Sequence, residues 1–398
     1  MYLRSTKIAF LLFIVLLSCN TEKQDSEESK NRGLKEIELY SARKNLKETK
    51  LSDYAKSIKY IKIDSSLLIQ SVWSLRTDGE YLGLINFSND LKSRSAVLLD
   101  KDGGLVRKIG AQGNGPGEFF SPRDIALFPE SRTIILDDNH GALLKYDYDG
   151  NFLDRTKIHY FSSPVIPLSD STFALFKTSD YGEGGTDMIK IFNLKLEVKK
   201  TMIDRSKYSG IYTQLGTASS FNVDNTGIHF WIGYSDTSYF LTDKMGLIPE
   251  NHYNIGPSQL TNELQYSNPK SRFKEYEYIA STITIRENSF ITYFDHGERY
   301  YMIHNSKLDK TSSIKSSLSF PYAGLENDID GGVSFFPAEQ LTGKTYYRSL
   351  DPLKLLKHKD ELIENAKSQG IETDNEFFSL LESINENDNP ILMLVEMK

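Results

Sequence analysis

Carboxylate, histidine and tyrosine side chains recur in short loops between the apolar, strand-like runs of this sequence. Acidic and aromatic groups on one concave face suit sugar hydroxyls, a Ca²⁺ ion or a basic peptide. Solvated turns are rich in the same residue types, so each residue also has a purely structural interpretation. The candidate ligand-binding residues are Asp137, Asp138, His140, Asp180, Tyr181, Tyr234, Asp236, Asp295 and His296.

Metal-assisted chemistry is the alternative interpretation of these loops. His140 and His296 occupy equivalent loops, and together with Asp138 and Asp295 they could hold Zn²⁺ or Ca²⁺. Motifs of the H-E-x-x-H and G-x-S-x-G kinds are absent from the sequence, so we assign no catalytic residue. Paired carboxylates for glycoside hydrolysis stay open, because their separation is a three-dimensional quantity. We therefore favour a binding or scaffold module for a glycan, peptide or partner protein over a metal-assisted hydrolase or lyase.

The elements that must position these loops are short strands in a repeating pattern. Two apolar runs flank an acidic turn at 96–106, and the pattern returns at 143–153 and 189–198. The turn residues Asp100, Asp147 and Asn193 are 47 and 46 positions apart. Asp-Gly turns between apolar runs are strong hairpin signals, and a period of 40 to 50 residues is typical of propeller blades.

An all-β, six-bladed β-propeller follows from this period. The first five blades are expected at 70–109, 123–158, 163–203, 218–255 and 279–317. The sixth begins at 330–336 and 344–350 and takes its remaining strands from the two chain ends, 390–398 and 57–63. Such pairing closes the ring and removes open sheet edges. An insertion at about 351–385 is expected to form two helices, with Asp351 capping the first and a Thr373–Glu376 capping box beginning the second.

Composition narrows the class of protein further. The chain has 398 residues, a net charge of −7 and one cysteine. The aromatic content is too high for a disordered chain, and one cysteine excludes a disulfide scaffold. The negative charge argues against a nucleic-acid partner. The glycine-rich loop at 110–117 lacks the spacing and the lysine of a phosphate-binding loop, and it leads into a strand.

The N-terminus predicts export and anchoring. A basic stretch precedes ten apolar residues at 8–17, which are too few to span a bilayer as a helix. The sole cysteine, Cys19, follows directly, and Leu16–Cys19 resembles a bacterial lipobox. We expect a signal peptide at 1–18, lipidation of Cys19, a flexible polar tether at 19–50 and the propeller at 51–398. A plain signal peptide with an incidental cysteine is the alternative. The predicted location is the cell envelope, as an outer-membrane lipoprotein facing the surface or the periplasm.

One loop carries a family resemblance. Gly110–Phe119, with the sequence GAQGNGPGEF, precedes Pro122–Leu127, PRDIAL. This run resembles the signature of NHL-repeat propellers. With the lipobox and the C-terminal run at 385–395, the chain resembles six-bladed β-propeller lipoproteins of Bacteroidetes, which are largely of unknown function. The resemblance implies a membrane partner through the lipid and a ligand such as a glycan, a peptide or a partner lipoprotein.

Overall fold

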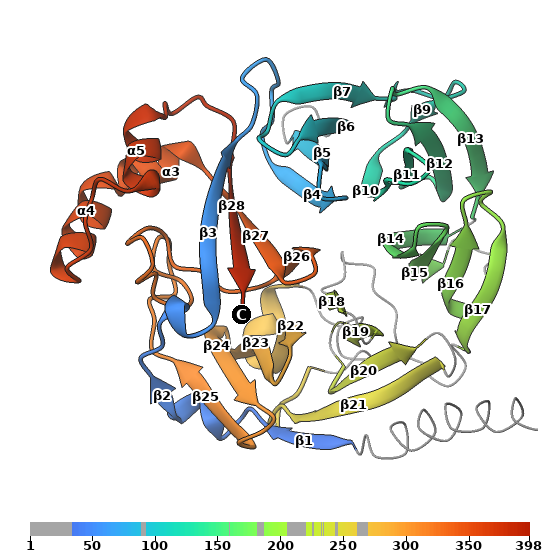
Figure 1. Ribbon diagram of the computed structural model, residues 1–398. Coiled ribbons are helices and arrows are strands. Elements are labelled where there is room, and N and C mark those ends of the chain that lie inside the picture. The colour runs from blue at the N-terminus through green and yellow to red at the C-terminus, as the bar shows by residue number, and fades with distance from the viewer. Residues whose placement is uncertain are drawn as a thin grey trace, which may run out of the picture.

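Six sheets, antiparallel apart from one added edge strand in each of two of them, form a ring around a central axis, each with its first strand innermost (Figure 1). The computed structural model describes residues 34–88, 93–158, 160–180, 187–204, 220–224, 227–231, 233, 235–242, 246–260 and 270–398. The predicted all-β, six-bladed propeller is confirmed. The predicted signal peptide and Cys19 lie outside the described residues.

The first three blades follow the predicted boundaries within a few residues. Blade one comprises β4 (Val72–Thr77), β5 (Tyr81–Ser88), β6 (Ser93–Asp100) and β7 (Leu105–Ile109). A short parallel pair, β8 (Ala111–Gln112) and β9 (Glu118–Phe119), then leads to the next blade. Blade two comprises β10 (Pro122–Phe128), β11 (Thr133–Asp138), β12 (Ala142–Asp147) and β13 (Phe152–Lys157). Blade three comprises β14 (Tyr160–Ser169), β15 (Thr172–Asp180), β16 (Asp187–Asn193) and β17 (Val198–Asp204).

The last three blades take strands from both ends of the described chain. Blade four comprises β18 (Ser220–Asp224), β19 (Gly227–Trp231), β20 (Thr237–Thr242), β21 (Gly246–Asn254) and β1 (Lys35–Glu38). Blade five comprises β22 (Glu277–Ile285), β23 (Asn288–Asp295), β24 (Glu298–Asn305), β25 (Lys310–Ile314) and β2 (Leu46–Lys47). Blade six comprises β26 (Glu339–Thr342), β27 (Thr345–Leu350), β28 (Ile391–Met397) and β3 (Ala55–Lys62).

The repeated acidic residue makes the same turn in three blades. Asp100 Oδ1 accepts the N–H groups of Asp102 and Gly104, at 2.9 Å each. Asp147 and Asn193 accept the equivalent pairs of N–H groups at 2.8 to 3.0 Å. A side-chain oxygen that caps the backbone two and four positions ahead fixes the turn between the third and fourth strands. The sequence repeat therefore reflects the same side-chain-capped turn in each of these three blades.

The ring closes by pairing the two chain ends, as predicted. β28 pairs antiparallel with β3, from Ile391 opposite Lys62 to Met397 opposite Ala55. Its other edge pairs with β27 over six residues. Ile391 and Met393 are fully buried in the largest apolar core cluster of the described chain, which joins blades five and six.

The predicted tether is wrong for its second half. β1 adds in parallel to the outer edge of β21, and β2 adds in parallel to β25. Two 3-10 turns, Ala42–Lys44 and Leu51–Asp53, complete this segment. Ile37, Leu39 and Leu51 are almost fully buried, because this segment covers the outer edges of blades four and five before it enters blade six.

Blade six departs from the prediction in its first strand and its insertion. The innermost strand is β26, whereas 333–336 is buried irregular chain, with Leu325 bridged to Phe335. The insertion contains three helices, because the first expected helix breaks at His358 into α3 (Pro352–Lys357) and α4 (Lys359–Ser368). Asp351 caps α3 as expected, but Asn375, and not Thr373, caps α5 (Glu376–Ser383). The three helices lie outside the ring beside blade six (Figure 1). Among the described residues, no helix combines the length and apolar character needed to cross a membrane.

Candidate functional site

A cavity of about 860 Å³ runs along the axis of the propeller. The innermost strands of all six blades line it. Trp73 and Arg123, at the starts of their strands, line one end, while Asp78, Asp170 and Asp224 line the other. The connections between second and third strands and between blades lie at the first end in such a topology, so we call it the mouth. Among these lining residues, arginine lies at the mouth and aspartate at the opposite end.

Asp124 ties three blades together inside the cavity wall. Its Oδ2 accepts a hydrogen bond from the Val165 backbone N–H at 2.8 Å and pairs with Arg76 Nη2 at 3.0 Å. Its Oδ1 accepts a hydrogen bond from the Ser74 hydroxyl. Asp124 is almost fully buried, and each of its oxygens is satisfied. We therefore assign this ion pair to the fold and leave it out of the ligand site.

Glu339 adds a second carboxylate to the wall. It is exposed to the cavity on β26, and enclosure by the surrounding blades raises its pKa, an effect that Arg76 partly offsets. Burial alone would lower the pKa of Arg76, but the negative charges of Asp124 and Glu339 raise it. The middle of the cavity thus carries one arginine beside two carboxylates.

The mouth carries an arginine stacked on a tryptophan. The Arg94 guanidinium lies 3.7 Å above the Trp73 ring, and Phe87 packs at 5.9 Å from the same ring. Arg94 Nη1 donates to the Pro122 carbonyl at 3.2 Å, while its buried Nε has no hydrogen-bond partner among the described residues. Burial and the like charge of Arg123 lower the pKa of Arg94 to about 10, although Asp137 opposes this. Trp73 keeps 47% of its surface exposed.

Two of the predicted ligand-binding residues in blade two, Asp137 and Asp138, are buried. Asp138 is buried, and its carboxylate accepts the N–H groups of Phe120 and Ser121 at 2.7 to 3.2 Å. Asp137 is fully buried within β11. A buried carboxylate that accepts hydrogen bonds from a loop backbone stabilises that loop, which favours a structural role for Asp138. His140 lies in the turn between β11 and β12, where its ring stacks on Phe120 with the ring centroids 3.8 Å apart.

The other predicted residues fall in three groups. Asp236 binds its own loop through Thr237 and lies 3.5 Å from His252 Nε2, away from the cavity lining. Asp180 ends β15, and its side chain is not described. Tyr181 and Tyr234 lie outside the described residues. The predicted residues therefore do not form one site in the described chain.

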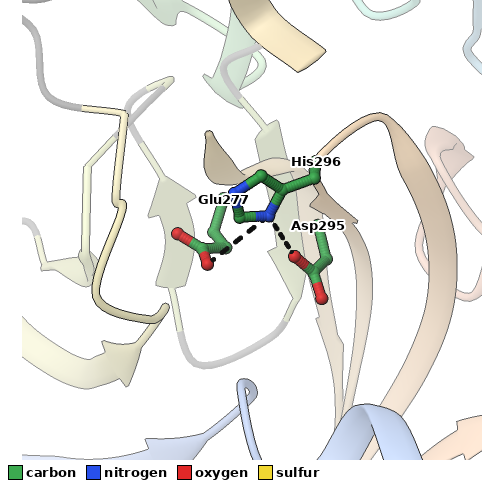
Figure 2. Close-up of side chains that lie close together, drawn as sticks. All are labelled: Glu277, Asp295 and His296. Atoms are coloured by element: carbon green, nitrogen blue, oxygen red, sulfur yellow. Dashed lines mark hydrogen bonds and ion pairs between the residues drawn. The ribbon is translucent and has the colours of Figure 1, made fainter. Parts of the chain in front are cut away.

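Asp295 and His296 meet a residue that the sequence analysis missed. His296 Nδ1 lies 2.6 Å from Asp295 Oδ1 and 3.7 Å from Glu277 Oε1, so the imidazole stands between two carboxylates (Figure 2). Asp295 Oδ2 also pairs with Arg43 Nε at 2.7 Å. The hydrogen bond with Asp295 raises the pKa of His296, and Glu277 adds to this. His140 and His296, which the sequence left as a conceivable metal pair, belong to blades two and five and do not converge.

The missed residues, Trp73, Arg94 and Glu277, all lie at or near strand starts. The predicted site residues all came from loops, although the first residues of the inner and third strands also lie at the mouth of a propeller. The position of Trp73 beside a predicted strand start was the one available signal, although it did not indicate the pairing with Arg94. Glu277 gave none, because it is one of several acidic residues in the run KEYEY.

Similarity to known proteins supports the fold and defines the family. A candidate exported protein of Bacteroides fragilis NCTC 9343 has a similar structure, with a TM-score of 0.62, 15% identity and coverage of 92% of this chain and 100% of that chain. A DUF4221 family member from Bacteroides vulgatus ATCC 8482 matches at a TM-score of 0.49 and 13% identity, covering 86% and 97%. No curated protein matches. The model of the domain of unknown function DUF4934 matches residues 34–396. The chain therefore belongs to the DUF4934 family.

Proposed function

We propose that this protein is a binding module of the cell envelope that takes an acidic glycan at the mouth of its central cavity. The observation that carries the proposal is the stack of Arg94 on Trp73, in which the buried guanidinium Nε has no hydrogen-bond partner among the described residues. A guanidinium favours planar, bidentate contact with a carboxylate or sulfate. The exposed part of the Trp73 ring offers an apolar surface for the face of a sugar ring.

The surroundings favour an anion at this end of the cavity. Arg123 lies close enough to lower the pKa of Arg94, so the two positive charges repel each other. A bound carboxylate would relieve this repulsion. At the opposite end, Asp78 and Asp224 favour the reverse polarity. A basic peptide is therefore disfavoured beside Arg94 and Arg123, and a neutral glycan would not relieve the repulsion between them.

Location and anchoring belong to the same proposal. The similar protein of B. fragilis is described as a candidate exported protein, which agrees with the apolar run at 8–17. We propose export and lipidation at Cys19, which places the binding module at the outer membrane. An exported module that binds glycans would meet its ligand at that surface.

Binding of defined oligosaccharides to the purified full chain tests this function. Oligogalacturonate should bind in a calorimetric titration, and a neutral malto-oligosaccharide of equal length should not. Arg94→Ala and Trp73→Ala should each abolish the heat of binding. Arg155→Ala, on the exposed outer strand β13, is the matched control and should bind as the parent does. Equal binding of the neutral and acidic sugars would refute the acidic-glycan assignment.

A further inference from the structure

Three side chains of blade five converge at the mouth end, apart from the Arg94 site on blade one. Glu277 begins the innermost strand β22, Asp295 ends β23, and His296 follows it. One ligand atom from each residue lies within 4.8 Å of the others. Figure 2 shows the imidazole facing both carboxylates. Two carboxylate oxygens and one imidazole nitrogen form a donor set for a divalent metal.

The turn at His296 holds the imidazole in this position. His296 and Gly297 form a two-residue hairpin turn with φ values of +50° and +88°. Two positive φ values in such a turn correspond to type I′, whose first position favours Asn, Asp or Gly. A histidine there carries a conformational cost that Asn would avoid. This backbone conformation places His296 Nδ1 2.6 Å from Asp295 Oδ1.

An independent observation comes from Glu277. Its side chain is 1% exposed, and Oε2 accepts the Ser258 N–H at 2.7 Å. Its other oxygen, Oε1, is buried without a hydrogen-bond partner in the described chain and lies 3.7 Å from His296 Nδ1. A buried carboxylate oxygen is unfavourable unless a donor or a cation satisfies it. A cation among these three donor atoms would satisfy it.

The groups behind the donors orient them. Arg43 holds Asp295 Oδ2, which leaves Oδ1 for the cluster, and the Ser258 N–H holds Glu277 Oε2. Partners of this kind fix the ligands of metal sites and tune their affinity. Arg43 comes from the N-terminal segment on the outer edge of blade five, so this segment also supports the site. The charges of the two carboxylates and Arg43 sum to −1, which suits a divalent ion.

We propose that Glu277, Asp295 and His296 bind one divalent transition metal ion, with Zn²⁺ as the best match. Ca²⁺ takes six to eight oxygen ligands, whereas this cluster supplies two carboxylates and a nitrogen. His296 is 53% exposed at its side chain, so the remaining coordination positions face solvent. This proposal goes beyond glycan binding and rests on a different blade.

Zinc titration of the full chain, stripped with a chelator, tests the site. The parent should bind one Zn²⁺ per chain, and Ca²⁺ should not compete. His296→Asn keeps a residue that favours the turn, so it should fold well and still lose at least about tenfold in Zn²⁺ affinity. Glu277→Gln should weaken binding in the same direction.

His252→Asn is the matched control. His252 also contacts two carboxylates, Glu36 at 2.7 Å and Asp236 at 3.5 Å, but it does not belong to the cluster of Glu277, Asp295 and His296. Its loss should therefore leave the proposed Zn²⁺ site intact. Zn²⁺ should raise the melting temperature of the parent and of His252→Asn, but not that of His296→Asn. Unchanged affinity in His296→Asn, or no Zn²⁺ binding by the parent, would overturn the proposal. Either result leaves the acidic-glycan test unaffected, because that test reads Arg94 and Trp73.

Discussion

Deleting residues 390–398 should prevent the propeller from folding. The deletion removes β28, whose side chains Ile391, Leu392, Met393, Val395 and Met397 are all 0 to 1% exposed. Full burial of such a side chain contributes about 1.5 to 3 kcal/mol, so the five contribute roughly 8 to 15 kcal/mol. The whole stability of a domain is about 5 to 15 kcal/mol. The lost burial alone is therefore as large as the free energy of unfolding of a whole domain. The deletion also leaves the edges of β27 and β3 without their partner strand.

Single substitutions in β28 should lower the free energy of unfolding by smaller amounts that depend on burial. Met393→Ala leaves a cavity in the core shared by blades five and six and should lower the free energy of unfolding by about 2 to 5 kcal/mol. Glu396→Gln is the matched control on the same strand. The Glu396 side chain is 43% exposed and pairs with Lys56 at 2.9 Å, so its replacement should leave the urea midpoint almost unchanged.

Urea unfolding, gel filtration and limited proteolysis measure these changes. The truncated chain should be aggregated or rapidly digested, because open sheet edges pair with other chains. Met393→Ala should shift the urea midpoint strongly, and Glu396→Gln should not. A truncated chain that stays monomeric with an unchanged melting temperature would refute the closure of the ring by β28 and β3.

Four further outcomes are expected. Cys19→Ala should abolish acylation and membrane retention, and acyl label in the mutant would contradict the lipidation. Burial alone would lower the pKa of His229, but hydrogen bonds with Asp224 and Glu250 raise it to about 9. Its contribution, on the order of 3 kcal/mol, is full below pH about 6.5 and lost as pH rises through 9, so His229→Gln should flatten unfolding free energy against pH there. Asp124→Ala should cost about 3 to 5 kcal/mol by leaving Arg76 unpaired, measured by urea unfolding. Asp138→Ala should cost about 1 to 3 kcal/mol in the same assay without changing glycan binding, and an unchanged midpoint would return it to the ligand site.

The fold was largely predictable because its repeat is local. Asp100, Asp147 and Asn193 each cap the turn in which they lie, so the hydrogen bonds that fix these hairpins join residues only a few positions apart. Ring closure followed from counting strands. The strands β1 and β2 were missed because each is short and polar on one face, and only the edges of distant blades make them strands.

The site was predictable only in part, because convergence is not local. Asp295 and His296 were found as a loop, but Glu277 joins them from a strand start 18 positions earlier. The sequence could not show that Asp138 holds the loop backbone, because a carboxylate in a turn and a ligand carboxylate have the same sequence signature. Arg94 stacks on Trp73 from another strand, and nothing in either local sequence marks the pair.

Fluorescence titration with an acidic oligosaccharide tests the central claim most directly. The protein has two tryptophans, and only Trp73 is exposed, since Trp231 is 1% exposed. Oligogalacturonate should therefore change the emission of Trp73 saturably, and added salt should weaken the effect. Arg94→Ala should abolish the saturable change while Arg155→Ala keeps it. A titration of Arg94→Ala that matches the parent, or a parent whose emission is unchanged by the acidic sugar, would contradict binding at this mouth.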